Sequence, residues 1–420
     1  MASERKPGAR TALMLLIGIN LFNYIDRQVL SAVEPEIRAT FFRPGDPNAM
    51  AMTGALATAF LVTYMLAAPA LGWLADRFSR WFIIGCAVVL WSLASGASGL
   101  AMTFTMLLLT RVFVGIGEGG YGPAAPTILA DLFPLTVRGR VMAAFAAAIP
   151  VGSALGYVLG GTIAVHLGWR WAFYLVTPPG LLLGLFCFFQ RDPRARLGGR
   201  SLRKRASLED YLALVKTRSF VLNTFAQTTM TFALGGIAFW MPAYLQFRQQ
   251  PPSSRILLGA ITVVAGLIST IVGGFLGDRL RARVAGSYFL VSGIGMLIAF
   301  PLFLGMLYAP FPAAWALFTG AVFFVFLNTG PSNTALANVS MPSVRATAFA
   351  LNILIIHALG DATSPPVIGL IAGRINMNAG FLLVSAMMLV SGLFWLAGMK
   401  FLSADTETVE LASVQDAATL

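Results

Sequence analysis

The stretch Gly72-Trp-Leu-Ala-Asp76-Arg77-Phe-Ser-Arg80 has a second, degenerate copy in the chain, Gly274-Phe-Leu-Gly-Asp278-Arg279-Leu-Arg281. The glycine, the aspartate and the first arginine each recur at the same offset of 202 residues, close to half of the 420-residue chain. Each copy follows a long apolar run. One Asp-Arg pair after a helix would mean little, but two copies at this spacing predict a chain built from two similar halves.

The composition indicates that these halves lie in a lipid bilayer. The chain is 57% hydrophobic and only 11% charged, with a mean hydropathy of +0.78, whereas soluble domains carry about 25% charged residues. This excludes a soluble enzyme, a disordered chain and a nucleic-acid binder, despite a net charge of +12. Two matching halves in a membrane protein are typical of secondary transporters.

Apolar runs long enough to cross a bilayer, about 20 residues each, occur repeatedly. The longest charge-free run, Val284–Val344, covers two spans, and Tyr308-Ala-Pro-Phe-Pro312 supplies the breakers for the turn between them. The sequence therefore predicts an all-α membrane protein with twelve transmembrane helices in two pseudo-symmetric six-helix halves. The predicted spans are 11–33, 50–73, 82–101, 104–126, 138–163, 168–190, 219–246, 255–277, 284–306, 312–336, 344–370 and 379–403.

The basic residues predict the orientation. Of the 29 lysines and arginines, 21 lie on the side that holds both termini, 6 lie on the other side and 2 lie within spans. The positive-inside rule then places both termini in the cytoplasm, and we expect a multi-pass protein of the bacterial inner (plasma) membrane. The positive charge reflects this topology and does not indicate a nucleic-acid partner.

The predicted domains are residues 1–190 and 219–420, joined by a basic cytoplasmic linker over 191–218. The linker contains Arg200-Ser-Leu-Arg-Lys-Arg205, followed by apolar residues at helical spacing from Leu208 to Val215. This pattern predicts an amphipathic helix on the inner leaflet. A solvated linker explains the pattern equally well.

Several motifs resemble one family. The duplicated loop is similar to the signature of the major facilitator superfamily, and the first half resembles its Spinster family. The matching stretches are Asn23-Tyr-Ile-Asp26-Arg27, Gly115-Ile-Gly-Glu118-Gly-Gly-Tyr121, Ala125-Pro-Thr-Ile-Leu-Ala-Asp131-Leu-Phe, Ile149-Pro-Val-Gly-Ser-Ala-Leu-Gly-Tyr157 and His357-Ala-Leu-Gly-Asp361-Ala-Thr-Ser-Pro365. The chain departs from the family pattern at Gly119-Gly120.

The resemblance implies a major facilitator fold and proton-coupled transport, by alternating access, of amphipathic lipids such as lysophospholipids or sphingoid phosphates. Protons, the substrate and membrane lipids are then the partners, and we expect a monomer. The alternative on the same fold is a proton-coupled organic-anion or drug transporter. A membrane enzyme is disfavoured because neither His-Glu-x-x-His nor Gly-x-Ser-x-Gly occurs. Two histidines are too few for a histidine-built metal site, and we expect no metal and no cofactor.

Charged residues inside the predicted spans mark the candidate site. Each costs about 2.5–3.5 kcal/mol near the bilayer centre, so Asp26, Arg27, Arg111 and Glu118 are expected to face a cavity or one another. Arg111 and Glu118 are two helical turns apart, or about 10 Å on one face. With Asn23, Tyr24 and Tyr121, the two arginines are predicted to line a substrate cavity.

Two carboxylates and two arginines make this set neutral when both carboxylates are ionised. Protonation of one carboxylate leaves net positive charge, which can attract an anionic head group, and this couples proton and substrate. Glu118 is the first candidate for the proton carrier because its sequence neighbours are glycines and no adjacent arginine holds it ionised. Asp26, beside Arg27, is the second. The alternative is an inert ion-pair network that only orients helices.

In the second half, Asn352, His357 and Asp361 are predicted to contribute to substrate binding or to relay protons. A hydrogen-bonded polar patch within the bundle is the alternative. Six residues are predicted to form a cytoplasmic gate, with an ordinary solvated turn as the alternative: Asp76, Arg77, Arg80, Asp131, Asp278 and Arg279. The glycines at 152, 156 and 160 resemble an antiporter signature, although glycines four apart also allow close helix packing in any membrane protein.

Overall fold

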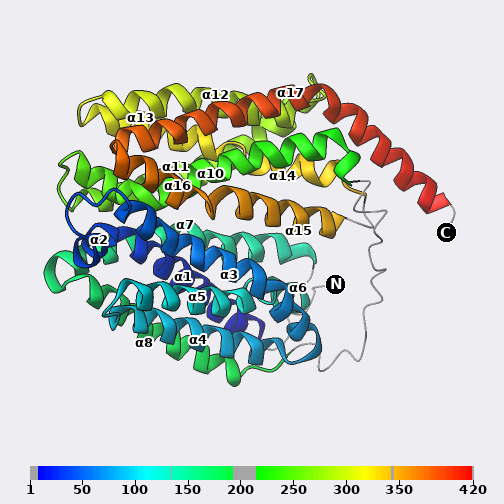
Figure 1. Ribbon diagram of the computed structural model, residues 1–420. Coiled ribbons are helices and arrows are strands. Elements are labelled where there is room, and N and C mark those ends of the chain that lie inside the picture. The colour runs from blue at the N-terminus through cyan, green and yellow to red at the C-terminus, as the bar shows by residue number, and fades with distance from the viewer. Residues whose placement is uncertain (1–7, 134, 193–213, 342–344, 419–420) are drawn as a thin grey trace. The chain divides into compact units, whose positions relative to one another are not determined.

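The computed structural model describes residues 8–133, 135–192, 214–341 and 345–418, and every regular element in these ranges is a helix (Figure 1). The helices, in chain order, are α1 (Ala9–Ala32), α2 (Glu34–Phe41), α3 (Ala49–Arg77), α4 (Arg80–Gly99), α5 (Phe104–Tyr121), α6 (Ala125–Leu132), α7 (Leu135–Leu167), α8 (Trp169–Phe188), α10 (Arg218–Phe247), α11 (Ser254–Arg281), α12 (Ser287–Tyr308), α13 (Ala313–Phe326), α14 (Thr329–Asn338), α15 (Arg345–Ile356), the π-helical turn η2 (His357–Asp361), α16 (Ser364–Arg374) and α17 (Met377–Ala418).

The predicted spans agree with these helices. Each of the twelve coincides with one helix or with consecutive helical segments, and α12 ends at Tyr308, where the breakers were expected. Nine helices in the part of the chain that the structure describes are long and apolar enough to cross a membrane. The shorter or more polar α1, α5 and α10 fall outside that set. α1 and α5 carry buried charged side chains, which lower their hydropathy.

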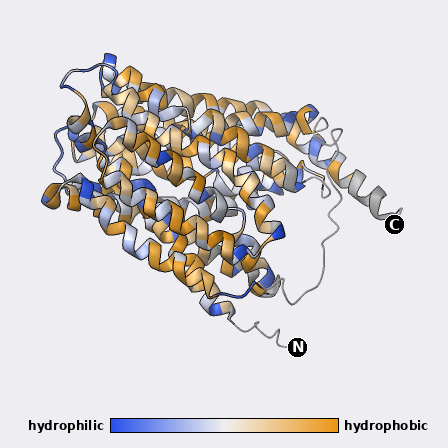
Figure 2. Ribbon diagram, turned by 60° about the horizontal axis from the view of Figure 1, so that its bottom comes forward, coloured by the Kyte–Doolittle hydropathy of each residue, from blue (hydrophilic) through white to orange (hydrophobic). Residues whose placement is uncertain are grey.

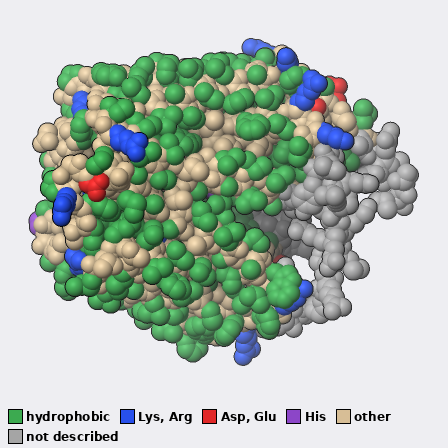
Figure 3. Space-filling model, in the orientation of Figure 1, with side chains coloured by type: hydrophobic (Ala, Val, Ile, Leu, Met, Phe, Trp, Pro, Cys, Tyr) green, Lys and Arg blue, Asp and Glu red, His purple; other side chains and the backbone are tan. Residues whose placement is uncertain are grey.

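The surface of the helices fits a bilayer. Apolar residues dominate most helices in Figure 2, and hydrophobic side chains cover much of the face seen in Figure 3. Leu66, Ile271 and Phe275 are among the large apolar side chains that are more than half exposed. In water such a surface would favour aggregation, whereas lipid acyl chains solvate it without cost.

The chain forms two compact units. Unit 1 comprises Met1–Ser201 with Ala238–Ala260, and unit 2 comprises Leu202–Ile237 with Ile261–Leu420. The segment Ala238–Ala260 joins unit 1 through specific contacts. The hydroxyls of Ser31 and Tyr157 donate to the Ala238 carbonyl at 2.7 and 2.6 Å, and Arg255 pairs with Glu36 at 3.3 Å. The predicted helix over the linker lies outside the described residues, and the predicted domain bounds stay a prediction.

Within unit 1, α1 packs along α7 through the glycines at 152, 156 and 160. A Cβ atom on Gly156 would lie 2.6 Å from the Ile25 carbonyl oxygen and 2.7 Å from Gln28 Cβ. Real Cβ contacts are not that short, so only glycine allows the two helices to come this close. Close packing therefore explains the glycine pattern, and an antiport-specific role for it stays a prediction.

The Gly156→Ala variant should consequently lose stability. The added methyl group must push α1 and α7 apart, and overpacking of this kind costs about 1–3 kcal/mol. Thermal unfolding of the purified protein measures the loss. Gly274→Ala is the matched control, because a Cβ there would meet no atom within 4 Å. Equal unfolding temperatures for the two variants would contradict the close-packing explanation.

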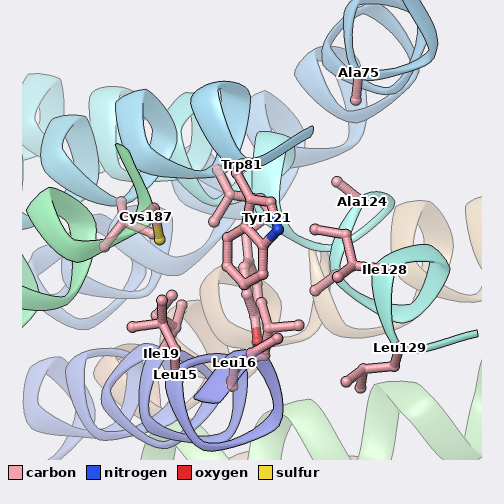
Figure 4. Close-up of a cluster of buried hydrophobic side chains, with 14 of the residues drawn as sticks. Leu15, Leu16, Ile19, Ala75, Trp81, Tyr121, Ala124, Ile128, Leu129 and Cys187 are labelled. Atoms are coloured by element: carbon pink, nitrogen blue, oxygen red, sulfur yellow. Dashed lines mark hydrogen bonds between the residues drawn. The ribbon is translucent and has the colours of Figure 1, made fainter. Parts of the chain in front are cut away.

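A buried apolar cluster packs the start of α1, the first part of α4, the end of α5 and α6 against one another (Figure 4). Figure 4 draws Tyr121 of α5, Trp81 of α4 and Leu16 of α1 as members of this cluster. The Tyr121 hydroxyl donates to the Leu16 carbonyl at 2.9 Å, so the polar end of this buried ring is satisfied. The cluster holds the start of α1 and the end of α5, the two helices that carry the charged site residues.

Candidate functional site

A cavity of about 150 Å³ lies in unit 1 among α1, α3, α5 and α7. Five of the predicted site residues line it: Asn23, Tyr24, Arg27, Glu118 and Tyr121. The other lining residues are Asn20, Tyr64, Gly122, Phe145 and Ile149. The cavity thus combines one ion pair with amides, phenol rings and apolar side chains.

The central contact of the cavity is an ion pair between α1 and α5. Arg27 Nη2 lies 2.6 Å from Glu118 Oε2, and Arg27 Nε donates to the same oxygen at 2.7 Å. The Glu118 side chain is fully buried, whereas that of Arg27 is 25% exposed. Glu118 Oε1 has no hydrogen-bond partner among the described residues, so these residues bond the carboxylate through its other oxygen.

Three aromatic rings surround the Arg27 guanidinium. Its central carbon lies 5.1 Å from the ring centroid of Tyr24, 4.8 Å from that of Phe60 and 5.4 Å from that of Tyr64. Such rings attract a cation through their negative faces. They hold the guanidinium at the cavity wall, where an anionic group of a ligand can reach it.

This arrangement corrects one expectation. Glu118 has no arginine beside it in the sequence, but Arg27, 91 residues away, binds it directly. The sequence placed Arg111 on the same face of the helix as Glu118, two turns away. Side chains two turns apart lie about 10 Å from each other, too far for a hydrogen bond, whereas the packing of α1 near α5 brings Arg27 within 3 Å.

Asp26 and Arg111 form a second charged group, and neither is among the residues that line the cavity. Both side chains are 2–3% exposed, and their opposite charges attract each other. Asp26 accepts a hydrogen bond from Ser95, and Arg111 donates to Ser98. Consecutive helical residues point about 100° apart, so Asp26 contacts α4 while Arg27 faces the cavity.

Sequence reasoning missed Ser95 and Ser98 of α4, which hold this second group. Together with Ser92 they recur every three residues, and all three are buried. Within an otherwise apolar helix, this spacing is a detectable sign of a polar face. Tyr64 was also missed; nothing in its local sequence distinguishes it from other aromatic residues of the spans.

The predicted residues of the second half belong to unit 2 and have contacts of their own. Asn352, 1% exposed, donates to Gln227 Oε1 at 3.1 Å. His357 Nδ1 lies 3.0 Å from Asp361 Oδ2 within the π-helical turn. Gln227 was missed by the sequence reasoning, and its buried Nε2 atom has no hydrogen-bond partner within the described ranges. α10 approaches this turn closely, since a Cβ on Gly235 would lie 2.5 Å from Asp361 Cβ.

Among the predicted gate residues, Arg80 and Asp131 are in contact, with 2.7 Å between Arg80 Nη2 and Asp131 Oδ2. Arg80 also pairs with Asp192 at 2.7 Å and donates to Thr127 at 3.1 Å. Asp192, which the sequence reasoning missed, lies 112 residues from Arg80. The guanidinium therefore contacts two carboxylates and one hydroxyl group of the protein.

The other gate residues make local contacts. Arg77 lies over the Trp73 ring at 3.6 Å, and Arg279 lies 5.8 Å from the Phe275 ring centroid. Asp278 accepts a hydrogen bond from the Tyr288 hydroxyl at 2.9 Å. The side chain of Asp76 lies outside what the structure describes. The gating role of this set stays a prediction.

No group of three histidines, cysteines, aspartates or glutamates that could hold a metal ion occurs among the described residues. A buried carboxylate outside the spans does occur, however, at the start of α2. Glu34 is 1% exposed and accepts hydrogen bonds from Thr53 at 2.7 Å and from Arg38 at 3.0 Å. Burial raises the pKa of Glu34 above its ordinary value, because the desolvation of the charged form outweighs its partners.

Glu34 should therefore make stability depend on pH. A carboxyl whose pKa is raised in the folded state contributes stability that is fully present below its unfolded pKa and is lost as the pH rises through the folded pKa. The Glu34→Gln variant, which keeps the neutral form, should lose this part of the pH dependence. Unfolding temperatures between about pH 4 and pH 8 measure it. Asp46→Asn, the same change in a turn, serves as the control; a wild-type profile for Glu34→Gln would contradict the expectation.

Comparison with known proteins establishes the family. A family model, the Major Facilitator Superfamily, matches residues 16–363. Protein spinster homolog 3 of Danio rerio is 33% identical over 438 residues, covering 95% of this chain and 86% of the relative. The chain belongs to the Spinster family of the major facilitator superfamily.

A second Spinster relative, the sphingosine-1-phosphate transporter SPNS2 of Danio rerio, is 32% identical over 92% of this chain and 83% of its own length. A crystal structure of a bacterial homolog to human lysosomal transporter Spinster, inward-facing and unoccupied, shares the fold, with a TM-score of 0.76 and 22% identity over 97% of this chain and 98% of that one. This Spinster protein is thus a multi-pass membrane transporter, and the expectation that it is not an enzyme is confirmed.

Proposed function

We propose that this protein is a proton-coupled secondary transporter that moves an amphipathic, lipid-like substrate by alternating access. Lysophospholipids and sphingoid phosphates are the substrate class. The observation that carries the proposal is the Arg27–Glu118 pair, in which a fully buried carboxylate binds a guanidinium at the cavity wall.

The proposed coupling follows from charge balance. While Glu118 is ionised, it occupies Arg27, and its other oxygen has no partner in the part of the chain that the structure describes. A proton on Glu118 removes this counter-charge, so Arg27 can turn its planar fork to a phosphate of the substrate, a strong bidentate contact. When Glu118 releases the proton, it competes again for Arg27 and weakens the hold on the substrate.

The lining of the cavity favours an amphipathic substrate over a small soluble anion. Tyr24, Tyr64 and Phe145 place aromatic surface beside the guanidinium, and rings of this kind bind apolar chains and charged heads together. The name of the SPNS2 relative, a sphingosine-1-phosphate transporter, points to the same substrate class. An organic-anion or drug transporter with the same coupling is the alternative.

We further propose that the protein lies in the bacterial inner membrane as a monomer with both termini in the cytoplasm, which the excess of basic residues on that side supports. In this orientation, the Arg80 contacts with Asp131 and Asp192 lie on the cytoplasmic side, where the proposed gate residues would stabilise the closed form.

Uptake into proteoliposomes tests the proposal. Lysophosphatidic acid, lysophosphatidylcholine, sphingosine-1-phosphate and a soluble aromatic carboxylate are offered with and without a pH gradient, and a pH dye inside the vesicles records proton flux. We expect uptake of a phospholipid-like compound that depends on the gradient and moves protons with it. Uptake of the carboxylate alone would favour the organic-anion alternative. Lipid uptake without proton flux would overturn the coupling.

A further inference from the structure

The cavity beside Arg27 is too small for a whole lipid. Its volume of about 150 Å³ is well below the range of about 300–1,000 Å³ that small-molecule sites cover. A head group can fill it, whereas the chain of a lysolipid must lie outside. The shape of the cavity therefore determines which head groups reach Arg27. This step rests on the proposed function, which brings the phosphate of a lipid to that arginine.

Tyr64 of α3 forms one wall of this cavity. Its ring centroid lies 5.4 Å from the central carbon of the Arg27 guanidinium. Phe60, one helical turn earlier, also faces the guanidinium, but it is not among the lining residues. Among the described residues of α3, only Tyr64 lines the cavity. The position of this ring therefore sets the room that α3 leaves beside Arg27.

The backbone of α3 is fixed at Tyr64 because α5 packs directly against it. Gly115 and Gly119 are four residues apart and lie on one face of α5. A Cβ atom on Gly115 would lie 3.0 Å from the Tyr64 amide nitrogen, and one on Gly119 would lie 3.3 Å from the Tyr64 carbonyl oxygen. The two backbones thus approach each other closely around Tyr64, which holds the base of its side chain in place.

The hydroxyl end of the Tyr64 side chain rests on Gly122, the residue directly after α5. A Cβ atom on Gly122 would lie 2.7 Å from Tyr64 Oη, and the next two atoms, at 3.7 and 3.9 Å, belong to the same ring. The hydroxyl therefore occupies space that exists because residue 122 has no side chain. Since the base of Tyr64 is fixed, a methyl group at residue 122 must turn the ring into the cavity that both residues line.

We propose that Tyr64, seated on Gly122, is a specificity-determining residue of the transport site and selects head groups by size. The cavity takes a phosphate monoester, whereas a phosphodiester must also place its second substituent between the Tyr64 ring and Arg27. A tyrosine has only two side-chain torsions. Held at its base by α5 and at its hydroxyl by Gly122, the ring cannot move aside for that substituent.

Binding to the purified full-length protein in detergent tests this proposal, with thermal unfolding followed during titration. The probes are lysophosphatidic acid, a monoester, and lysophosphatidylglycerol, an anionic diester with the same acyl chain. Gly122→Ala should raise the midpoint concentration for lysophosphatidylglycerol about tenfold, equivalent to about 1.4 kcal/mol, and that for lysophosphatidic acid by less. Tyr64→Leu removes the wall and should lower the lysophosphatidylglycerol midpoint relative to that of lysophosphatidic acid. Both substitutions are uncharged, so a changed ratio reports shape.

A double variant separates this steric effect from a general loss of packing. In Gly122→Ala/Tyr64→Phe, the hydroxyl that the new methyl group meets is absent, and the nearest ring atom would lie 3.7 Å from the Cβ atom, an ordinary contact. The double variant should therefore recover the wild-type ratio of the two midpoints. Gly274→Ala, whose Cβ atom would meet nothing within 4 Å, is the matched control and should keep that ratio.

The same ratio in the wild type, Gly122→Ala and Tyr64→Leu would overturn the proposal, as would a double variant that behaves like Gly122→Ala. If Gly122→Ala does not fold, the ratio in Tyr64→Leu decides alone. A wild type that binds neither lipid would overturn the proposed substrate class and this inference together. A wild type that binds both lipids with a ratio that no variant changes would overturn this inference alone. Proton flux is not measured, so the proposed coupling is tested separately.

Discussion

In proteoliposomes with an imposed pH gradient, the Glu118→Gln protein should take up substrate no faster than empty vesicles. Glutamine has the shape of a protonated glutamate and keeps an oxygen that can accept from Arg27, but it cannot release a proton. The site is then held in its substrate-binding form. Exchange of labelled for unlabelled substrate, which needs no net proton movement, should survive at least in part.

The measurement is proton flux and substrate flux in the same vesicles. Asp46→Asn is the matched control, because it makes the same carboxylate-to-amide change in a turn, where Asp46 Oδ1 accepts from the Asn48 backbone. It should transport like the wild type. Full gradient-driven uptake by the Glu118→Gln protein would move the proton-carrier assignment to Asp26 or Asp361, or end the proton-coupled interpretation.

Asp26→Asn separates the two buried carboxylates. Asp26 contacts Ser95 and does not line the cavity, so the geometry ranks it behind Glu118, the same order that the sequence suggested on weaker grounds. If Asp26→Asn loses coupling and Glu118→Gln keeps it, the proton pathway runs through the Asp26–Arg111 group. If both lose it, the two carboxylates titrate as one coupled unit.

The sequence predicted much of the fold because hydrophobic length and breakers are local properties. The end of α12 at Tyr308 and the restart at Ala313 follow from two prolines within three residues. The sequence could not predict that Ala238–Ala260 belongs to unit 1, because this depends on contacts such as that between Arg255 and Glu36, 219 residues apart.

The site was predicted by residue type but not by pairing. A charge inside a span must find a partner, so Asp26, Arg27, Arg111 and Glu118 could be singled out from the sequence. Which arginine meets which carboxylate depends on how α1 rotates against α5 and α4. A rotation of about 100° would exchange the directions of Asp26 and Arg27, and no pattern within one helix determines that angle.

Arg27 is the residue whose replacement should cost most stability. In the Arg27→Ala protein, Glu118 stays fully buried without its counter-ion, and the loss of one partner of a buried pair costs about 3–5 kcal/mol. The double variant Arg27→Ala/Glu118→Gln removes both charges and should recover most of this loss. Thermal unfolding of the wild type, the two single variants and the double variant gives the interaction energy directly. A double variant no more stable than Arg27→Ala would contradict a buried pair.

Arg27→Lys tests the binding role without the loss of charge. Lysine keeps the positive group beside Glu118 but lacks the planar fork that bonds a phosphate through two N–H groups and stacks on Tyr24 and Phe60. We expect about a tenfold loss of affinity for anionic sphingosine-1-phosphate, equivalent to about 1.4 kcal/mol, and a smaller loss for zwitterionic lysophosphatidylcholine, whose ammonium offsets part of the attraction.

Arg111→Lys is the matched control. It makes the same change at a buried arginine that contacts Ser98 and lies 5.2 Å from the Phe173 ring centroid, away from the cavity lining, so it should change the unfolding temperature but not the preference between the two lipids. A shift in that preference with Arg111→Lys and none with Arg27→Lys would assign the substrate to Arg111, the arginine on the same helix as Glu118.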